Sequence, residues 1–270
     1  MRQKILLLSE ARHGTTYFIG NIRNSYKGSC EKVIACYEIM TGARHLVPQA
    51  GTCLYACQNG KYYKDKKKFV DRLDDDDVIF PTENITVGEI LKLRKWSERE
   101  YLKLFMQEVS NRKHGEVFIC KIFTSQIALH GVGNPHTLEE VLDYFDKIII
   151  LDRDKLEYVF SHCNAMYFPS SKTPWAVSEA QNKKVNITLT DKHVLNYRYV
   201  IERKEEIFNN AREYCKKNKK EYLDVDYNKL DDWTEISKFT GLELNGNKFE
   251  RNNYDYESFL ENNPKLKSIL

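Results

Sequence analysis

The chain has 270 residues, of which 41% are hydrophobic and 30% are charged. A chain of this size can bury a full core, so we expect one folded domain over 1–270 rather than disorder. Lys and Arg (42) nearly balance Asp and Glu (39), which excludes the broad basic field of nucleic-acid-binding proteins, and no nucleic-acid partner is expected.

Short apolar runs without polar alternation recur along the chain and predict strands that are buried on both faces. These runs span 4–8, 32–36, 116–120, 147–151 and 221–225.

Helical periodicity separates the strands, over 97–112, 137–145 and about 194–215. The second helix begins with Thr137 as N-cap, and Glu140 completes a capping box. Strands that alternate with helices indicate a parallel sheet covered on both faces. The fold class predicted is therefore α/β, a three-layer sandwich with a central parallel sheet.

The segment 42–96 interrupts this rhythm and is predicted to be an insertion or lid in the single domain. Its KDKKK run at 64–68 and DDDD run at 74–77 have opposite signs that offset each other, so we assign them no chemistry.

Cysteine usage and hydropathy bear on the cellular compartment. The seven Cys are an odd number, and several lie in apolar runs, which favours buried free thiols in a reducing compartment. Cys53 and Cys57 lack a second ligand pair at zinc spacing, so no metal site is expected. No apolar stretch reaches about 18 residues, so we expect a soluble cytoplasmic protein without membrane insertion.

The first predicted strand leads into SEARHGTTYFIGNI, in which Gly14, Thr15 and Thr16 precede an apolar helix. Backbone N–H groups and the helix dipole bind anions at such a turn, and Arg12 adds a forked cation. A kinase-type phosphate loop needs an earlier Gly and a Lys after Gly14, and both are missing here. The motif predicts an anion site without Mg-nucleotide, although a plain turn before a helix also explains it.

A second element follows the strand at 147–151, which delivers Arg153 at its end and then a helix with Ser161 eight residues later. ARHGTT at 11–16 resembles the PRSGTT loop of the sulfotransferase family, and Arg153 with Ser161 resembles the family's R-x7-S element. The resemblance implies a P-loop-NTPase-like sulfotransferase fold. It also implies that the donor's 3′-phosphate is held by Arg153 and Ser161. Its 5′-phosphosulfate would be held by Arg12, His13, Gly14, Thr15 and Thr16.

Farther along, LDVDYNKLDDWTEISKFTGLEL at 223–244 is similar to the family's Y-E-D-L segment and the F-L-G-L that follows its helix. The resemblance implies that Tyr227 lies near the adenine, while an amphipathic Tyr packed beside the sheet is the alternative. The chain departs from the family pattern where Ala11 replaces Pro, His13 replaces Ser and Asn228 replaces Glu.

Sulfuryl transfer needs a base for the acceptor proton and a cation where charge grows on the leaving oxygen. Glu38 follows a predicted strand at the ligand edge of the sheet, and a Glu is similarly placed in carbohydrate and bacterial sulfotransferases. The competing bases are His45 and His130. Lys121 ends the strand at 116–120 and resembles the family's Lys that reaches the sulfuryl group. With Arg12, Glu38 and Lys121 are the predicted catalytic residues.

Two further residues, Lys172 and Trp175, follow the helix of Ser161 and are candidates for the acceptor mouth, although packing explains Trp175 equally well. The resemblance as a whole implies a sulfotransferase that uses 3′-phosphoadenosine 5′-phosphosulfate (PAPS), without a metal, on a hydroxyl or amine of a small-molecule or carbohydrate acceptor. A nucleotide kinase or NTPase and a catalytically silent nucleotide-binding module remain as alternatives. The sequence indicates neither the acceptor nor the oligomeric state.

Overall fold

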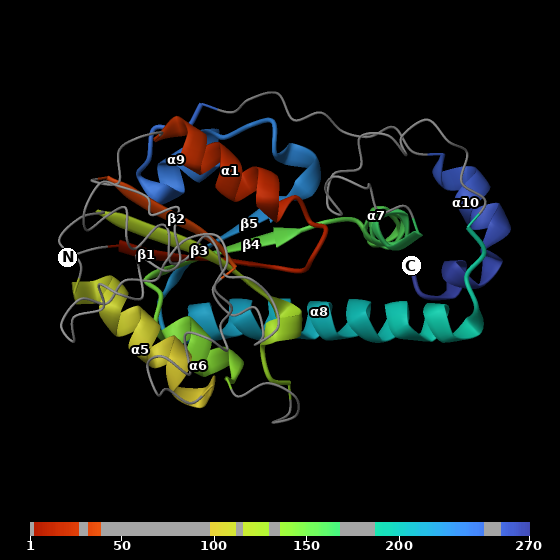
Figure 1. The fold of residues 1–270 in the computed structure, drawn as a ribbon, viewed down its shortest axis with the longest axis horizontal. Coiled ribbons are helices and arrows are strands. Elements are labelled where there is room, and N and C mark those ends of the chain that lie inside the picture. Colours follow the sequence, from red (N-terminus) through yellow and green to blue (C-terminus); the bar gives the residue numbers. More distant parts are fainter. Residues whose placement is uncertain are drawn as a thin grey trace, which may run out of the picture.

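The computed structural model describes residues 3–26, 32–38, 98–111, 116–129, 136–167, 187–245 and 255–270. These residues form a five-stranded sheet in the order β2-β3-β1-β4-β5, with every neighbouring pair parallel. Helices cover both faces (Figure 1). The predicted α/β class and central parallel sheet are confirmed, and the layering is that of a three-layer sandwich.

All five predicted strands are present, and their observed bounds are close to those of the apolar runs. The strands are β1 Gln3–Ser9, β2 Val33–Glu38, β3 Val117–Phe123, β4 Lys147–Asp152 and β5 Glu221–Asp226. One boundary differs in a way that matters for the site, because β3 runs on to Phe123. Lys121 therefore lies inside the strand instead of ending it, since it pairs with Leu7 of β1 in a continuous ladder.

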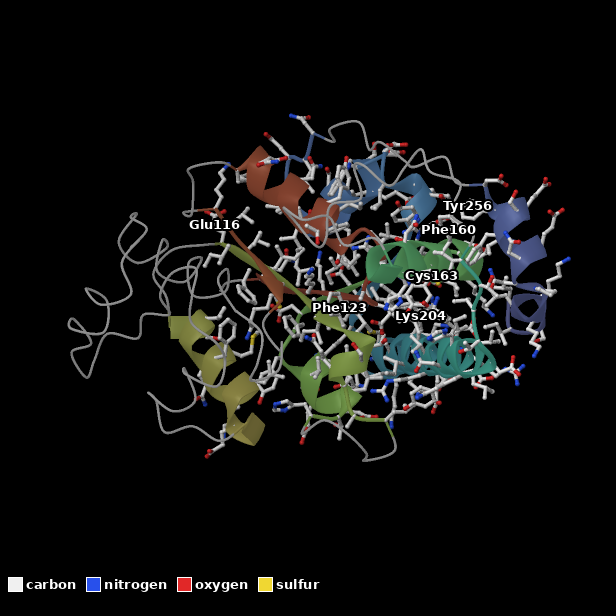
Figure 2. All side chains as sticks on the ribbon, turned by 45° about the vertical axis from the view of Figure 1, so that its right-hand side comes forward. Glu116, Phe123, Phe160, Cys163, Lys204 and Tyr256 are labelled. Carbon is white, nitrogen blue, oxygen red and sulfur yellow. The ribbon has the colours of Figure 1, made fainter. Side chains whose placement is uncertain are left out.

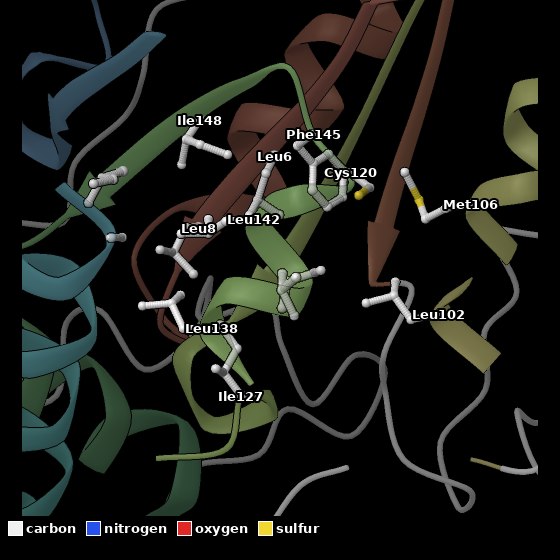
Figure 3. Packing of buried hydrophobic residues seen from close by; sticks show 14 of the residues in the cluster. Leu6, Leu8, Leu102, Met106, Cys120, Ile127, Leu138, Leu142, Phe145 and Ile148 are labelled. Carbon is white, nitrogen blue, oxygen red and sulfur yellow. The ribbon is translucent and has the colours of Figure 1, made fainter. Parts of the chain in front are cut away.

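The two faces of the sheet carry separate hydrophobic clusters, because successive side chains of a strand point to opposite faces. Ile5 and Leu7 of β1 pack toward α1 (Thr15–Ser25) and α9 (Thr234–Thr240). Leu6 and Leu8 pack on the other face, toward α5 (Glu98–Asn111), α6 (Leu138–Asp143) and α8 (Asp191–Lys217) (Figures 1 and 3).

The predicted helices are confirmed, and α6 has the expected start. The Thr137 hydroxyl accepts from the backbone N–H of Glu140 at 3.2 Å, and the Glu140 carboxylate accepts from the Thr137 N–H at 3.0 Å. Helix α8 begins at Asp191, earlier than the periodicity indicated, because Thr190 caps it. Its exposed first turn contributes little to an apolar pattern.

A third cluster joins the N-terminal part of α8 to α7 (Lys155–Tyr167) and α10 (Tyr256–Asn262). Phe160 of α7 meets Phe259 of α10 edge to face, with ring centroids 4.8 Å apart. Tyr256 contacts the same ring at 5.5 Å (Figure 2). The cluster fixes α7, which follows Arg153, against the C-terminal segment.

Some of the sequence predictions fall outside the described residues. The insertion predicted at 42–96 lies there, and so do Cys53 and Cys57. Within the described ranges, Cys120, Cys163 and Cys215 are buried free thiols, as expected. In the same ranges no helix is long and apolar enough to span a bilayer.

The order of the strands indicates where a ligand would bind at the carboxyl edge of the sheet. The chain leaves β1 toward β2, past β3, whereas it leaves β4 in the opposite direction toward β5. Ligands of open α/β sheets bind where neighbouring connections diverge in this way. The loop after β1 and the residues after β4 are therefore expected to line the site.

Candidate functional site

The loop between β1 and α1 has an unusual backbone. Arg12 has a φ of 68° and Gly14 has a φ of 77°, both in the left-handed region. A residue with a side chain is uncommon there, and turns of this kind direct backbone N–H groups toward one side. Helix α1 starts at Thr15 with Gly14 as its N-cap, so the cap residue supplies no side chain for the first N–H groups. The start of α1 is therefore suited to an anion.

Gly14 is required by packing as well as by its backbone angle. A Cβ at this position would lie 2.9 Å from both Cδ2 and Cε2 of Tyr227 and 3.1 Å from Cδ1 of Leu230. The loop thus lies directly against the residues that follow β5. Any side chain at Gly14 would push the loop away from them.

Arg153 joins the same assembly from the end of β4. Its Nη1 donates to the carbonyl oxygen of Arg12 at 2.8 Å, and its guanidinium carbon lies 3.9 Å from the centroid of the Tyr227 ring. Its Nε donates to the Glu157 carboxylate at 3.2 Å. The structure therefore brings together two elements that are 141 residues apart in sequence, the ARHGTT loop and the arginine of R-x7-S.

Ser161 and Thr16 are placed less favourably. Ser161 is buried on α7, two turns beyond Arg153. Thr16 is exposed in the first turn of α1. Their predicted contacts with the donor stay predictions.

Lys121 reaches the loop from β3. It is 2% exposed, and its Nζ donates to the Thr15 hydroxyl at 3.3 Å. Thr15 stands where a kinase-type phosphate loop has its lysine. The structure thus supplies a buried cation to the first turn of α1 from a different strand.

Glu38, the predicted base, is the last residue of β2 and lies opposite Lys121 in the register of β2 and β3. The pairing shifts by one residue between Cys36 and Glu38, so a bulge precedes it. The side chain of Glu38 is outside the described part of the structure. The other candidates named from the sequence lie entirely outside the described residues: His45, His130, Lys172 and Trp175.

The His13 side chain is completely buried beneath the loop. Its Nδ1 lies 3.2 Å from the Leu151 carbonyl oxygen. Because a carbonyl can only accept, Nδ1 carries the proton. Burial and, to a smaller extent, the positive charge of Lys204 together lower the pKa of His13 to about 3, against the opposing effect of the Asp152 carboxylate. The neutral ring holds the loop against β4, and binding of the donor by His13 stays a prediction.

Sequence reasoning assigned no function to Glu10, which is buried at the end of β1. Its carboxylate accepts from the hydroxyl of Thr124, from the Ser125 hydroxyl at 3.5 Å and from the Ala11 N–H at 2.8 Å. The carboxylate ties the loop to the turn after β3. Two adjacent hydroxyl residues directly after a strand were the signal available in the sequence.

Lys204 of α8 was also missed. Its Nζ lies 2.7 Å from the Asp152 carboxylate, which accepts the Arg153 N–H at 2.8 Å as well. The signal was a lysine at helical spacing from buried Ile201 and Phe208, a position that should be apolar. A buried lysine needs a partner, and Asp152 is that partner.

A comparison with models of protein families finds none that matches the chain, and a comparison with curated proteins finds no significant match. The resemblance to sulfotransferases therefore rests on the residues and on their geometry.

Replacing Gly14 tests how tightly the loop is packed. Gly14→Ala should lower the free energy of unfolding by at least about 1 kcal/mol more than Gly241→Ala. Both glycines have a left-handed φ, of 77° and 72°, but a Cβ at Gly241 meets nothing within 4 Å. Urea unfolding of the two variants measures the difference. Equal losses would show that the contact with Tyr227 does not constrain position 14.

The buried neutral His13 predicts a pH dependence of stability. As the pH falls below 6.5 the unfolded chain binds a proton at this residue, whereas the folded chain does so only near pH 3. The stability linked to His13 is thus complete above pH 6.5 and is lost as the pH falls toward 3. Between pH 7 and pH 5 the loss should be about 2 kcal/mol larger in the wild type than in His13→Asn. The free energies of unfolding are measured in urea at these pH values. An equal loss in the wild type and in His13→Asn would contradict a buried, neutral His13.

Proposed function

We propose that this protein is a sulfotransferase of P-loop-NTPase-like fold that transfers a sulfuryl group from PAPS to a hydroxyl or amine. The observation that carries the proposal is the contact of Arg153 with the loop carbonyl of Arg12. It puts a buried guanidinium beside the start of a helix that is suited to an anion. A nucleotide with phosphates at both its 5′ and 3′ positions needs two such sites next to each other.

The residues at this edge of the sheet fit a doubly phosphorylated nucleotide. Arg12 and Lys121 supply positive charge around the loop, and the first turn of α1 has no acidic side chain. Arg153 uses two of its five N–H donors on described residues, which leaves three for a phosphate. Glu157 offsets part of this charge, so binding of the 3′-phosphate has to compete with it.

PAPS would supply an activated sulfuryl group, and the chain's own residues would position it and stabilise the developing charge. In this proposal the N–H groups from Gly14 to Thr16 and the Arg12 side chain hold the 5′ end of the donor. Lys121 would stabilise the negative charge on the leaving oxygen, with the Thr15 hydroxyl beside it. Glu38 would take the acceptor proton from the neighbouring strand.

The carboxylates near the loop disfavour the kinase or NTPase alternative. A Mg-nucleotide site needs carboxylate or water ligands for the metal. Glu10 is engaged by two hydroxyls and a backbone N–H, and Asp152 by Lys204 and the Arg153 N–H. A silent nucleotide-binding module has the same geometry and differs only in lacking turnover of labelled PAPS.

Calorimetric titration tests the nucleotide site directly. The wild type should bind adenosine 3′,5′-bisphosphate more tightly than AMP and without a requirement for Mg²⁺. Arg153→Ala should weaken binding of the bisphosphate by roughly 10- to 100-fold, because a hydrogen bond to a charged group contributes about 1.5–3 kcal/mol. Arg198→Ala, on the exposed side of α8, is the matched control and should leave the affinity unchanged.

Two results would contradict the proposal. One is binding of Mg-ATP by a protein that does not bind the bisphosphate, which favours the kinase alternative. The other is an equal affinity of wild type and Arg153→Ala for the bisphosphate, which removes the 3′-phosphate site.

A further inference from the structure

The ring of Tyr227 is enclosed by the two elements of the candidate site. Tyr227 directly follows β5 and begins the short helix η3 (Tyr227–Lys229), and only 8% of it is exposed. The guanidinium of Arg153 lies over its face at 3.9 Å from the centroid. The Cα of Gly14 approaches the same ring so closely that a Cβ there would be 2.9 Å from two ring carbons.

These contacts determine where the guanidinium of Arg153 lies. An arginine side chain is long and has several rotatable bonds, so its position depends on what it packs against. Here the face of the Tyr227 ring supports the guanidinium at 3.9 Å, while the Arg12 carbonyl fixes the direction of Nη1. Both partners belong to, or pack on, the loop that begins α1. The position of the guanidinium relative to the loop is therefore set jointly by the Tyr227 ring and by the Arg12 carbonyl.

Such a fixed position has a consequence for selectivity. Two anion sites held at one separation bind best a ligand whose two phosphates have that separation, because neither the protein nor the ligand has to adjust. We propose that Tyr227 is a positioning residue that makes the site select 3′,5′-bisphosphorylated nucleotides over nucleotides with other phosphate arrangements. This inference rests on the proposed function. It gives Tyr227 a role different from the adenine contact that the resemblance implies.

Three adenine nucleotides separate positioning from contact with the base. Adenosine 3′,5′-bisphosphate, its 2′,5′ isomer and AMP share the base, and the two bisphosphates have equal charge. Their affinities are measured by calorimetry for the wild type, Tyr227→Phe and Tyr227→Leu. Tyr227→Met is measured as well, because its longer, unbranched side chain adapts to the space of the ring without an aromatic face. Tyr199→Leu, at an exposed tyrosine of α8, is the matched control.

The wild type should prefer the 3′,5′ isomer over the 2′,5′ isomer and AMP, and Tyr227→Phe should keep that preference because the ring remains. Tyr227→Leu and Tyr227→Met should reduce the preference by about tenfold, with little change in the affinity for AMP. Urea unfolding identifies which variants are folded. The affinity for the 3′,5′ isomer, relative to the affinities for the other two nucleotides, is compared among those variants.

An equal loss of affinity for all three nucleotides in the Leu and Met variants would show contact with the base and overturn the inference. An unchanged preference in these variants would overturn it as well. Failure of the proposed function is visible separately, because the wild type itself would then not bind the 3′,5′ isomer.

Discussion

The hydrogen bond from Arg153 to the carbonyl oxygen of Arg12 is the contact on which the rest of the site depends. It joins the ends of β1 and β4, the two neighbouring strands whose connections leave in opposite directions. The carbonyl it uses belongs to a residue in the left-handed region, where a side chain costs roughly 1–2 kcal/mol. The surrounding contacts must offset that cost. The loop is therefore held from the neighbouring strand β4, and α1 begins directly after it.

One ion pair and one buried carboxylate support this contact. Lys204 pairs with Asp152, and the same carboxylate oxygen accepts a hydrogen bond from the Arg153 N–H. These contacts hold the end of β4, from which the Arg153 side chain extends. Glu10 is held by hydroxyls of the turn after β3. Charges removed from water are stable only when they are paired or hydrogen-bonded in this way. Burial and, secondarily, the positive charge of Lys204 lower the pKa of His13 and keep its ring neutral.

The sequence was most informative where local patterns decide the structure. Five apolar runs located five strands, and Thr137 with Glu140 located the start of α6, because burial on two faces and end-capping are encoded within a few residues. The motif residues Gly14 and Arg153 also indicated the correct edge of the sheet. Their functional assignments were made by resemblance, and the geometry shows only that they meet.

The remaining features depend on contacts between distant segments, which no local pattern contains. Lys204 pairs with a residue 52 positions away, and Thr124 meets Glu10 across 114. The stack of Tyr227 on Arg153 needs the order of β4 and β5 in the sheet to be known first. The extension of β3 to Phe123 was missed because Lys121 interrupts the apolar run, although its side chain is buried at the loop.

A crystal structure of the protein with adenosine 3′,5′-bisphosphate tests the central claim most directly. The 5′-phosphate should lie at the N–H groups of Gly14, Thr15 and Thr16, and the 3′-phosphate on the guanidinium of Arg153, which should still lie over the Tyr227 ring. A nucleotide bound elsewhere, or bound here with its 3′-phosphate away from Arg153, would contradict this claim.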